Sequence, residues 1–495
     1  MNKNMLSTLI LAGVLAVSGV SASCSDNADI PSMPVTETLP DWEDNVDGSI
    51  YDWTATMSPE RPYMHDYNNA IVSKLFMGRP DGEGNCIVSL TFEEALDVIK
   101  GVDQLSRGVP KIVYLVGWQY EGHDWKYPAF FEFNEALKRP QDANAQESYR
   151  WLREEAKKYN TTVSVHVLLN DAEINSPLWH EYVKNDFINL DASGNMIPYA
   201  VFNNIQVYSV NIVNEWRKGY LQKRLEKLIE LADLDDAKTV HFDAFFGRTS
   251  PYHGTTIEDN EVVMRKILRW LRDKNIDVTA EFWHNVQRVD PMYGLQACSW
   301  WDDRAAYEQT QVPRDLAGGG RKGRFQEWPA EIFLFGDTYG IEDDFNFVDV
   351  DRSKNWGNAW GKAYAGVALH LVPMLYFNSH DMVKYDSNKQ TMIYSDGLVA
   401  DYPNKIVKKG NLILRDHDNT FFPLVQKGGN EIMAYSKSGY GSKRWTLPED
   451  WASLAEVKAY DLNENGLSGE RTLSVTDGSV ILRMAPNSII LLQKQ

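Results

Sequence analysis

The chain has 495 residues, of which 43% are hydrophobic and 24% are charged. This is the balance of a globular protein with one large domain and one or two smaller ones. Its 69 acidic and 50 basic residues give a formal net charge of −19, which argues against nucleic acid and anionic membrane surfaces as binding partners. The three cysteines, Cys24, Cys86 and Cys298, lack the spacing of a zinc site.

Residues 1–23 have the pattern of an export signal: one Lys, then an apolar run, then small residues. Cys24 follows directly and resembles the lipidated cysteine of a bacterial lipoprotein, although Ser21 stands where Leu is usual. The acidic SDNAD segment after it resembles the signal that sends lipoproteins to the cell surface in Bacteroides-type bacteria. We therefore expect an outer-membrane or cell-surface lipoprotein, with ordinary cleavage near Ala22 or Ser23 as the alternative.

Residues 24–85 are predicted to form a tether and a short N-terminal segment, because Pro, Asp, Ser and Thr are frequent in its first part and periodicity is weak. A helix is predicted to begin at Thr91, because Thr91 and Glu94 have the spacing of a capping box.

Residues 86–390 are predicted to form a (β/α)8 barrel, an α/β fold of parallel strands and helices. Eight short apolar runs lie in this segment, and amphipathic helical patterns separate several of them. A barrel of this kind has about 250 residues plus loops. An open doubly wound sheet is the alternative, but no glycine-rich phosphate turn favours it. The predicted strands are KIVYLVGW (111–118), TTVSVHVLLN (161–170), YSVNIV (208–213), KTVHFDAFF (238–246), DVTAEFW (277–283), LQACSWW (295–301), EIFLFGD (331–337) and PMLYFNSH (373–380).

Residues 391–495 are predicted to form a C-terminal antiparallel β-sandwich. Helical periodicity ends near residue 395, and alternating segments separated by Gly, Asn and Asp turns follow.

Polar residues follow most of the predicted barrel strands. In such barrels the chemistry lies at the carboxyl ends of the strands, so these residues indicate a site for a hydroxyl-rich ligand. They are Trp118, Gln119, His123, Asp124, His166, Asn170, Asp171, Asp243, Glu281, Trp283, His284, Trp300, Trp301, Asp302, Asp337, Asn378, His380 and Asp381.

Asp243 and Glu281 are the candidate catalytic pair. Glycoside cleavage needs one ionised carboxylate and one protonated carboxyl group, and burial raises the pKa of the less solvated acid. Glu281 lies beside Phe282 and Trp283, so it is the predicted acid/base, and Asp243 is the predicted nucleophile. The alternatives are a structural ion pair for Asp243, a core histidine for His166 and core packing for Trp300 and Trp301. A metal hydrolase is a further alternative, without an HxH or HExxH motif to favour it.

Four segments resemble the endo-α-N-acetylgalactosaminidases of glycoside hydrolase family 101. These are VGWQYEGHDWKYP, VSVHVLLNDAEINSP, VHFDAFFG and VTAEFWHN, within a resemblance that spans about residues 90–385. The resemblance implies a retaining enzyme that releases the Gal-β1,3-GalNAc disaccharide from Ser or Thr of mucin-type glycoproteins. It makes Asp243 the nucleophile, Glu281 the acid/base and Asp124 a ligand of sugar hydroxyls, with Trp118, His166 and Trp283 lining the pocket.

The full set of expected substrate-binding residues comprises Trp118, Gln119, Asp124, His166, Asn170, Trp283, Asp337 and Asn378. The expected partners are O-glycans of mucin-type glycoproteins and, through the lipid anchor, the outer membrane; the protein is expected to be a monomer. No cofactor is expected to be required and no metal site is predicted, while a structural calcium ion is left open.

Two departures from the family pattern bear on specificity. Only about sixty residues separate Cys24 from the barrel, where family members carry a large β-sandwich, and residues 183–207 offer Tyr199 and Phe202 but no Trp for a lid. Two alternatives therefore stay open: an exo-acting α-galactosidase-like or α-N-acetylgalactosaminidase-like enzyme, and a non-catalytic glycan-binding lipoprotein.

Overall fold

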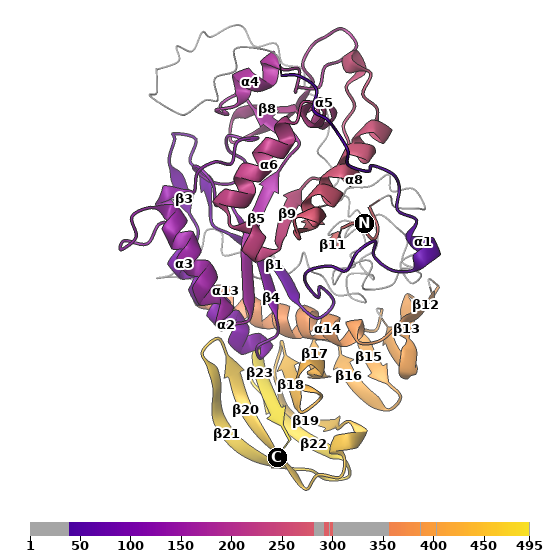
Figure 1. The fold of residues 1–495 in the computed structure, drawn as a ribbon. Helices are drawn as coiled ribbons and strands as arrows, with labels where there is room; N and C mark the ends of the chain where they lie inside the picture. Colours follow the sequence, from indigo (N-terminus) through magenta and orange to yellow (C-terminus); the bar gives the residue numbers. More distant parts are fainter. Residues whose placement is uncertain are drawn as a thin grey trace, which may run out of the picture. The chain divides into compact units, whose positions relative to one another are not determined.

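The computed structural model describes residues 39–281, 292–296, 298–299, 356–386, 388–401 and 403–494. All of them belong to one unit, Thr36–Gln495. Within the described residues, this unit contains a parallel sheet of six strands with its helices and, after it in the chain, a large antiparallel sheet (Figure 1). No helix among the described residues is long and apolar enough to cross a membrane.

The parallel sheet has the strand order β1-β4-β5-β9-β10-β11. Its strands are β1 (Ile71–Phe76), β4 (Lys111–Val116), β5 (Thr161–Leu168), β9 (Thr239–Asp243), β10 (Asp277–Ala280) and β11 (Cys298–Ser299), and every neighbouring pair is parallel. Helices α2 (Phe92–Ser106), α3 (Ala145–Lys157), α6 (Tyr220–Leu231) and α8 (Ile257–Asp273) connect successive strands (Figure 1). The predicted strands at 111–118, 161–170, 238–246 and 277–283 therefore correspond to β4, β5, β9 and β10.

The sheet begins earlier in the chain than the sequence pattern indicates. β1 lies inside residues 24–85, the segment predicted to be a tether and a short N-terminal segment, and its six residues pair in register with Lys111–Val116 of β4. Five of the six are buried, including the polar Ser73 and Lys74. Those two residues interrupt the apolar run and hide it from a search for hydrophobic strands.

The sheet is strongly curved. β1 and β10 are four strand spacings apart, which would separate them by about 19 Å in a flat sheet. The Lys74 side chain on β1 nevertheless contacts Glu281, the residue that follows β10. The inner face of the sheet therefore folds around a shared interior.

Two of the predicted barrel strands are wrong. The run at 208–213 is split between β8 (Ile205–Ser209), which pairs antiparallel with β6 (Asp171–Glu173) and β7 (Pro198–Phe202), and the helix α5 (Ile212–Arg217). The side chain of Asn211 caps α5 and ends the extended segment. The run at 373–380 is mostly helix α14 (Val372–Asn378), with Pro373 in its first turn. The predicted strand at 331–337 lies outside the described residues.

The helices begin where capping predicts. The Thr91 and Glu94 side chains form the expected capping box of α2, and Thr256 and Asp259 form a second one at α8. Val263, Ile267 and Leu271 lie on the buried face of α8, so the 3.6-residue period correctly identifies its core side.

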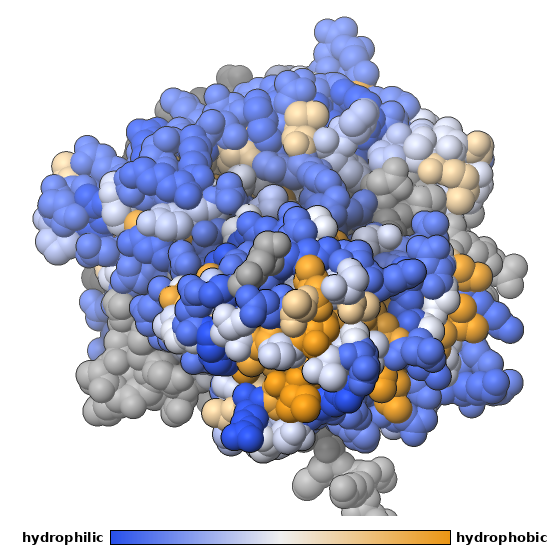
Figure 2. All heavy atoms as spheres, turned by 90° about the horizontal axis from the view of Figure 1, so that it is seen from below, coloured by the Kyte–Doolittle hydropathy of each residue, from blue (hydrophilic) through white to orange (hydrophobic). Residues whose placement is uncertain are grey.

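The C-terminal part confirms the predicted antiparallel β structure, with a sandwich-like pairing of sheets. The ten-stranded sheet and the separate β19–β22 pair share a core that contains Phe421, Trp445 and Trp451. Seen from below the view of Figure 1, the surface of the molecule is mostly hydrophilic, with a few apolar side chains among the polar ones (Figure 2). The strands are β12 (Met382–Asp386), β13 (Thr391–Tyr394), β14 (Leu398–Asp401), β15 (Ile406–Lys409), β16 (Leu412–Asp416), β17 (Asn419–Pro423), β18 (Glu431–Ser436), β19 (Tyr440–Thr446), β20 (Glu456–Asn463), β21 (Gly466–Ser474), β22 (Ser479–Met484) and β23 (Ser488–Gln493).

Candidate active site

Asp243 and Glu281 lie at the carboxyl ends of neighbouring parallel strands. Asp243 is the last residue of β9, and Glu281 directly follows β10. The Glu281 backbone N–H donates to the Phe242 carbonyl at 2.9 Å, and the Phe245 N–H donates to the Glu281 carbonyl at 2.9 Å. The ladder between the two strands thus continues to the catalytic candidates and fixes their separation.

Glu281 is buried, and within the described part of the chain its carboxyl group has two charged neighbours. It is 3% exposed, it forms an ion pair with Lys74 of β1, and it lies within hydrogen-bonding reach of Asp243. Desolvation by burial, followed by the charge of Asp243, raises the pKa of Glu281 to about 7, while the charge of Lys74 opposes this rise. Glu281 can therefore carry a proton near neutral pH, as a general acid must.

Two histidine rings, those of His166 and His241, lie beside the carboxyl pair, and a third histidine contacts one of them. His166 of β5 places Nε2 3.4 Å from Asp243 Oδ2, and its ring stacks on His241 at 5.2 Å. His123 meets His166 edge-on at 5.5 Å. Burial lowers the pKa values of His166 and His241 well below the usual range. These two imidazoles are therefore neutral at the pH of most enzymes.

One cluster has the ligand types of a metal site. His166, His241 and Glu281 offer ligand atoms that all lie within 4.8 Å of one another. The ammonium group of Lys74 already binds Glu281, so a metal ion would have to displace a positive charge. We therefore interpret this cluster as a proton-transfer site and assign no metal to it.

A second acidic group surrounds Asp124. Burial, together with Asp124, raises the pKa of Glu173 to about 8, and burial raises that of Asp171 to about 6. Arg248 binds Asp171 at 2.6 Å, and its guanidinium lies 3.7 Å from the ring centre of Tyr199. Asp124 itself is half-buried and lies 3.4 Å from His123 Nε2. Asp171, Glu173 and Arg248 are buried, whereas Asp124 and Tyr199 are partly exposed and can offer an acceptor and a donor to hydroxyl groups.

Three of the predicted binding residues are buried, and two of them donate hydrogen bonds to the backbone next to the site residues. The Trp118 indole N–H donates to the His166 carbonyl at 2.9 Å, and its fully buried ring packs on Phe133. Asn170 donates to the carbonyls of Ala244 and Phe246 at 3.1 and 2.8 Å and so fixes the turn that follows Asp243. Gln119 is also fully buried.

Asn378 does not reach this site, and its prediction is wrong. It ends α14 rather than a strand, and its side-chain amide donates to the Asn68 carbonyl at 3.0 Å. Asn68 precedes β1, so this contact lies at the amino end of the sheet. Trp283 and Asp337 lie outside the described residues, as do His284, Trp300, Trp301, Asp302 and Cys24.

Lys74 and His241 are site residues that the sequence analysis missed. Each is a polar residue inside an apolar strand, which is the same signal that identifies Asp243 and His166. Arg248 and Glu173 were missed because they lie on loop and hairpin segments without strand periodicity.

Comparisons with known proteins bear on the segment that carries these residues. Residues 86–299 match the family model described as endo-alpha-N-acetylgalactosaminidase. No curated protein matches the chain in sequence.

Two solved structures show weak similarity in fold. The alpha-N-acetylgalactosaminidase NagBb from Bifidobacterium bifidum, in complex with GalNAc, is 11% identical with a TM-score of 0.47, over 69% of this chain and 58% of that chain. The chain thus spans less than two thirds of that enzyme's length. The alpha-amylase from Geobacillus thermoleovorans, complexed with acarbose, is 11% identical with a TM-score of 0.41, over 87% of this chain and 100% of that chain.

The family match points to a glycoside hydrolase that acts on N-acetylgalactosamine, and it includes Asp243 and Glu281. The segment from residue 86 to residue 299 therefore confirms the resemblance to glycoside hydrolase family 101 that its strand motifs predict.

Proposed function

We propose that the protein is a retaining glycoside hydrolase that cleaves α-linked N-acetylgalactosamine and releases the core 1 disaccharide Gal-β1,3-GalNAc from Ser or Thr of mucin-type O-glycoproteins. The observation that carries the proposal is the close pairing of Asp243 with a buried, protonatable Glu281 at adjacent strand ends. Retaining enzymes use such a pair as nucleophile and acid/base.

The interaction between the two carboxyl groups supports retention over inversion. An inverting enzyme separates its carboxyl groups by about 6.5–9.5 Å to admit a water molecule between acid and base, whereas a retaining enzyme holds them about 5–5.5 Å apart. The charge of Asp243 raises the pKa of Glu281, as expected for two carboxyl groups that share one site. We therefore assign the pair to the retaining class, and the anomeric configuration of the first product tests this assignment.

The proposed reaction has two steps. An Asp243 oxygen forms a bond to the anomeric carbon while the bond to the glycosidic oxygen breaks and Glu281 donates its proton to that oxygen. The Glu281 carboxylate then takes a proton from water, which attacks the anomeric carbon and releases Asp243. The neutral ring of His166, 3.4 Å from Asp243 Oδ2, adds no positive charge that would weaken the nucleophile.

The sugar-binding residues follow from the resemblance and from position. Asp124 is proposed to bind sugar hydroxyls together with Tyr199 of β7. Trp118, Gln119, His166, Asn170, Trp283 and Asp337 remain proposed members of the pocket or of its supporting wall.

The proposed fold is the complete (β/α)8 barrel, and the proposed location is the outer membrane. The sheet curves so strongly that a side chain of β1 contacts Glu281 after β10, and this supports the proposal that the six parallel strands belong to the predicted (β/α)8 barrel.

Lipidation at Cys24 is proposed to hold the enzyme on the outer membrane, as a monomer that binds mucin-type glycans.

One incubation tests the reaction and its specificity. The protein without residues 1–23 is mixed with para-nitrophenyl α-glycosides of Gal-β1,3-GalNAc and of GalNAc, and products are followed by mass and by anomeric NMR. Intact disaccharide that appears first as the α-anomer is the expected result. First appearance of the β-anomer would contradict retention. Release of GalNAc alone would favour the exo-acting alternative. Binding of the glycan without cleavage of either substrate would favour a glycan-binding protein.

A further inference from the structure

Lys74 stands apart from the other site residues. It lies on β1, opposite Tyr114 of β4, and its side chain is 3% exposed. It precedes residue 86, where the family match begins, so that match assigns it no role. Its ammonium group forms an ion pair with Glu281, whose side chain is 4% exposed. Burial of an ammonium group lowers the stability of a folded protein unless an opposite charge compensates for the lost hydration.

The groups that face Glu281 come from several strands. Lys74 lies on β1, His166 on β5, and His241 and Asp243 on β9. The two histidines are held neutral by burial. Among the described residues, the electrostatic balance around Glu281 therefore depends chiefly on the Lys74 ammonium group and on the carboxyl groups of Asp243 and Glu281 itself.

The charge on these two carboxyl groups changes place during the proposed reaction. Before the reaction, Asp243 is ionised and Glu281 is protonated. In the glycosyl-enzyme, Asp243 is an uncharged ester and Glu281 is ionised. The ammonium group of Lys74, which pairs with Glu281, therefore faces a carboxylate in the glycosyl-enzyme.

We propose that Lys74 is a positioning residue that stabilises the ionised form of Glu281 after it has donated its proton, so that Glu281 can act as base in the second step. This inference rests on the proposed function. Without Lys74, the Glu281 carboxylate in the glycosyl-enzyme would be a buried charge with no counter-ion from β1, and it would retain a proton.

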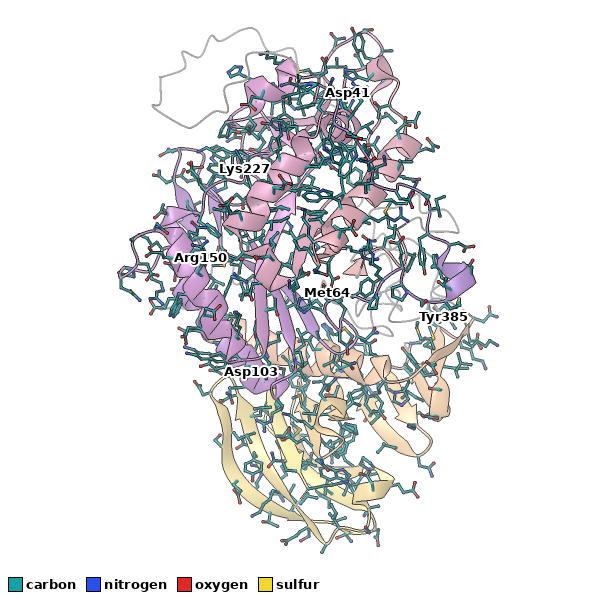
Figure 3. The ribbon with its side chains drawn as sticks, viewed as in Figure 1. Asp41, Met64, Asp103, Arg150, Lys227 and Tyr385 are labelled. Atoms are coloured by element: carbon teal, nitrogen blue, oxygen red, sulfur yellow. The ribbon has the colours of Figure 1, made fainter. Side chains whose placement is uncertain are left out.

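The test compares three variants of Lys74 and one control variant by three readouts. Lys74→Met removes the charge at similar volume, Lys74→Gln is a neutral variant that can still bind Glu281, and Lys74→Arg retains the charge. Lys111→Met is the matched control: Lys111 is also a buried strand lysine with a carboxylate partner, but that partner is Asp103 of α2, far from the carboxyl ends of the strands (Figure 3). The readouts are the pH profile of kcat/KM on a glycoside with a poor leaving group, whose cleavage needs the Glu281 proton, a carbon-13 NMR titration of glutamate carboxyls, with Glu281→Gln to identify the resonance, and the burst of aryl alcohol from an aryl glycoside.

In Lys74→Met or Lys74→Gln, we expect the alkaline limb of the profile and the Glu281 titration to move upward by about 1–3 pH units. The glycosyl-enzyme should accumulate, and a burst of aryl alcohol should therefore precede a slower steady state. Lys74→Arg should keep the alkaline limb of the pH profile near its wild-type position, and Lys111→Met should leave that limb unchanged.

An unchanged limb and titration in a folded neutral variant would overturn the role of Lys74, and so would an equal shift in Lys111→Met. If Lys74→Met fails to fold, Lys74→Gln decides. If the wild-type protein cleaves no glycoside, the proposed function fails, and the NMR titration alone still decides whether Lys74 controls Glu281.

Discussion

At the scale of single residues, Asp243 and Glu281 are distinguished by their surroundings. The side chain of Asp243 is 15% exposed and that of Glu281 is 4% exposed. Burial raises the pKa of Glu281 to about 7 in spite of the ion pair with Lys74. Desolvation therefore outweighs the attraction of the nearby ammonium group, and this gives the two carboxyl groups separate roles.

Substitution of these two residues should affect different steps. Asp243→Asn should abolish turnover of every substrate, because no glycosyl-enzyme can form. Glu281→Gln should slow cleavage of natural glycosides by about 10²–10⁴-fold, while aryl glycosides with acidic leaving groups should form the intermediate at a rate close to that of the wild type. Single-turnover kinetics on both substrate types measures the difference. An equal loss on both would contradict the acid assignment.

The residues of the site were predictable only where each one carries its own signal. Asp243, Glu281 and His166 are polar residues in or next to apolar strands, and that signal needs no knowledge of the fold. The partnership between Lys74 and Glu281 depends on a curvature that brings β1 to the end of β10, and no local pattern encodes it. The prediction for Asn378 is wrong because it depended on a strand that is a helix.

At the scale of the elements, short apolar runs are ambiguous. Residues 161–168 and 372–378 are both largely buried, yet the first segment is β5 and the second is α14. Hydrophobicity alone cannot separate a buried strand from a buried helix. Val163, Val165 and Val167 favour extended backbone in β5, whereas Met374 and Leu375 are compatible with helix.

A glycine on α2 tests how tightly the helices pack. A Cβ atom at Gly101 would lie 2.2 Å from the ring of Trp360 on α13 (Trp356–Gly366), which is 4% exposed. Gly101→Ala gains about 1 kcal/mol of helix propensity but forces a buried ring to move, which typically costs about 1–3 kcal/mol. We therefore expect a net decrease in the free energy of unfolding, measured by chemical denaturation. Gly441→Ala is the control, because nothing lies within 4 Å of the added Cβ. Equal stability of both variants would contradict tight packing between α2 and α13.

At the scale of the whole molecule, the chain buries acids while carrying a net charge of −19. Asp171, Glu173 and Glu281 are at most 3% exposed, and burial raises the pKa values of all three. A carboxyl group with a raised pKa in the folded state binds its proton more tightly there than in the unfolded chain. Its contribution to stability is therefore present at low pH and is lost as the pH rises through the folded-state pKa.

Glu173 gives the widest pH window for testing this argument. Its pKa rises from 4.5 to about 8 on folding, mainly through desolvation by burial. Each unit of such a shift corresponds to about 1.4 kcal/mol. The wild-type protein should therefore lose stability between pH 4.5 and pH 8 through this group, and Glu173→Gln should lose less, because an amide can still accept the backbone N–H of Lys126 without titrating. Chemical denaturation of both proteins at pH 5 and pH 8.5 measures the effect. Glu456→Gln, on the exposed surface of β20, controls for the general loss of one negative charge. If the difference between Glu173→Gln and wild type is the same at both pH values, burial does not raise the pKa of Glu173, and the predicted pH dependence is wrong.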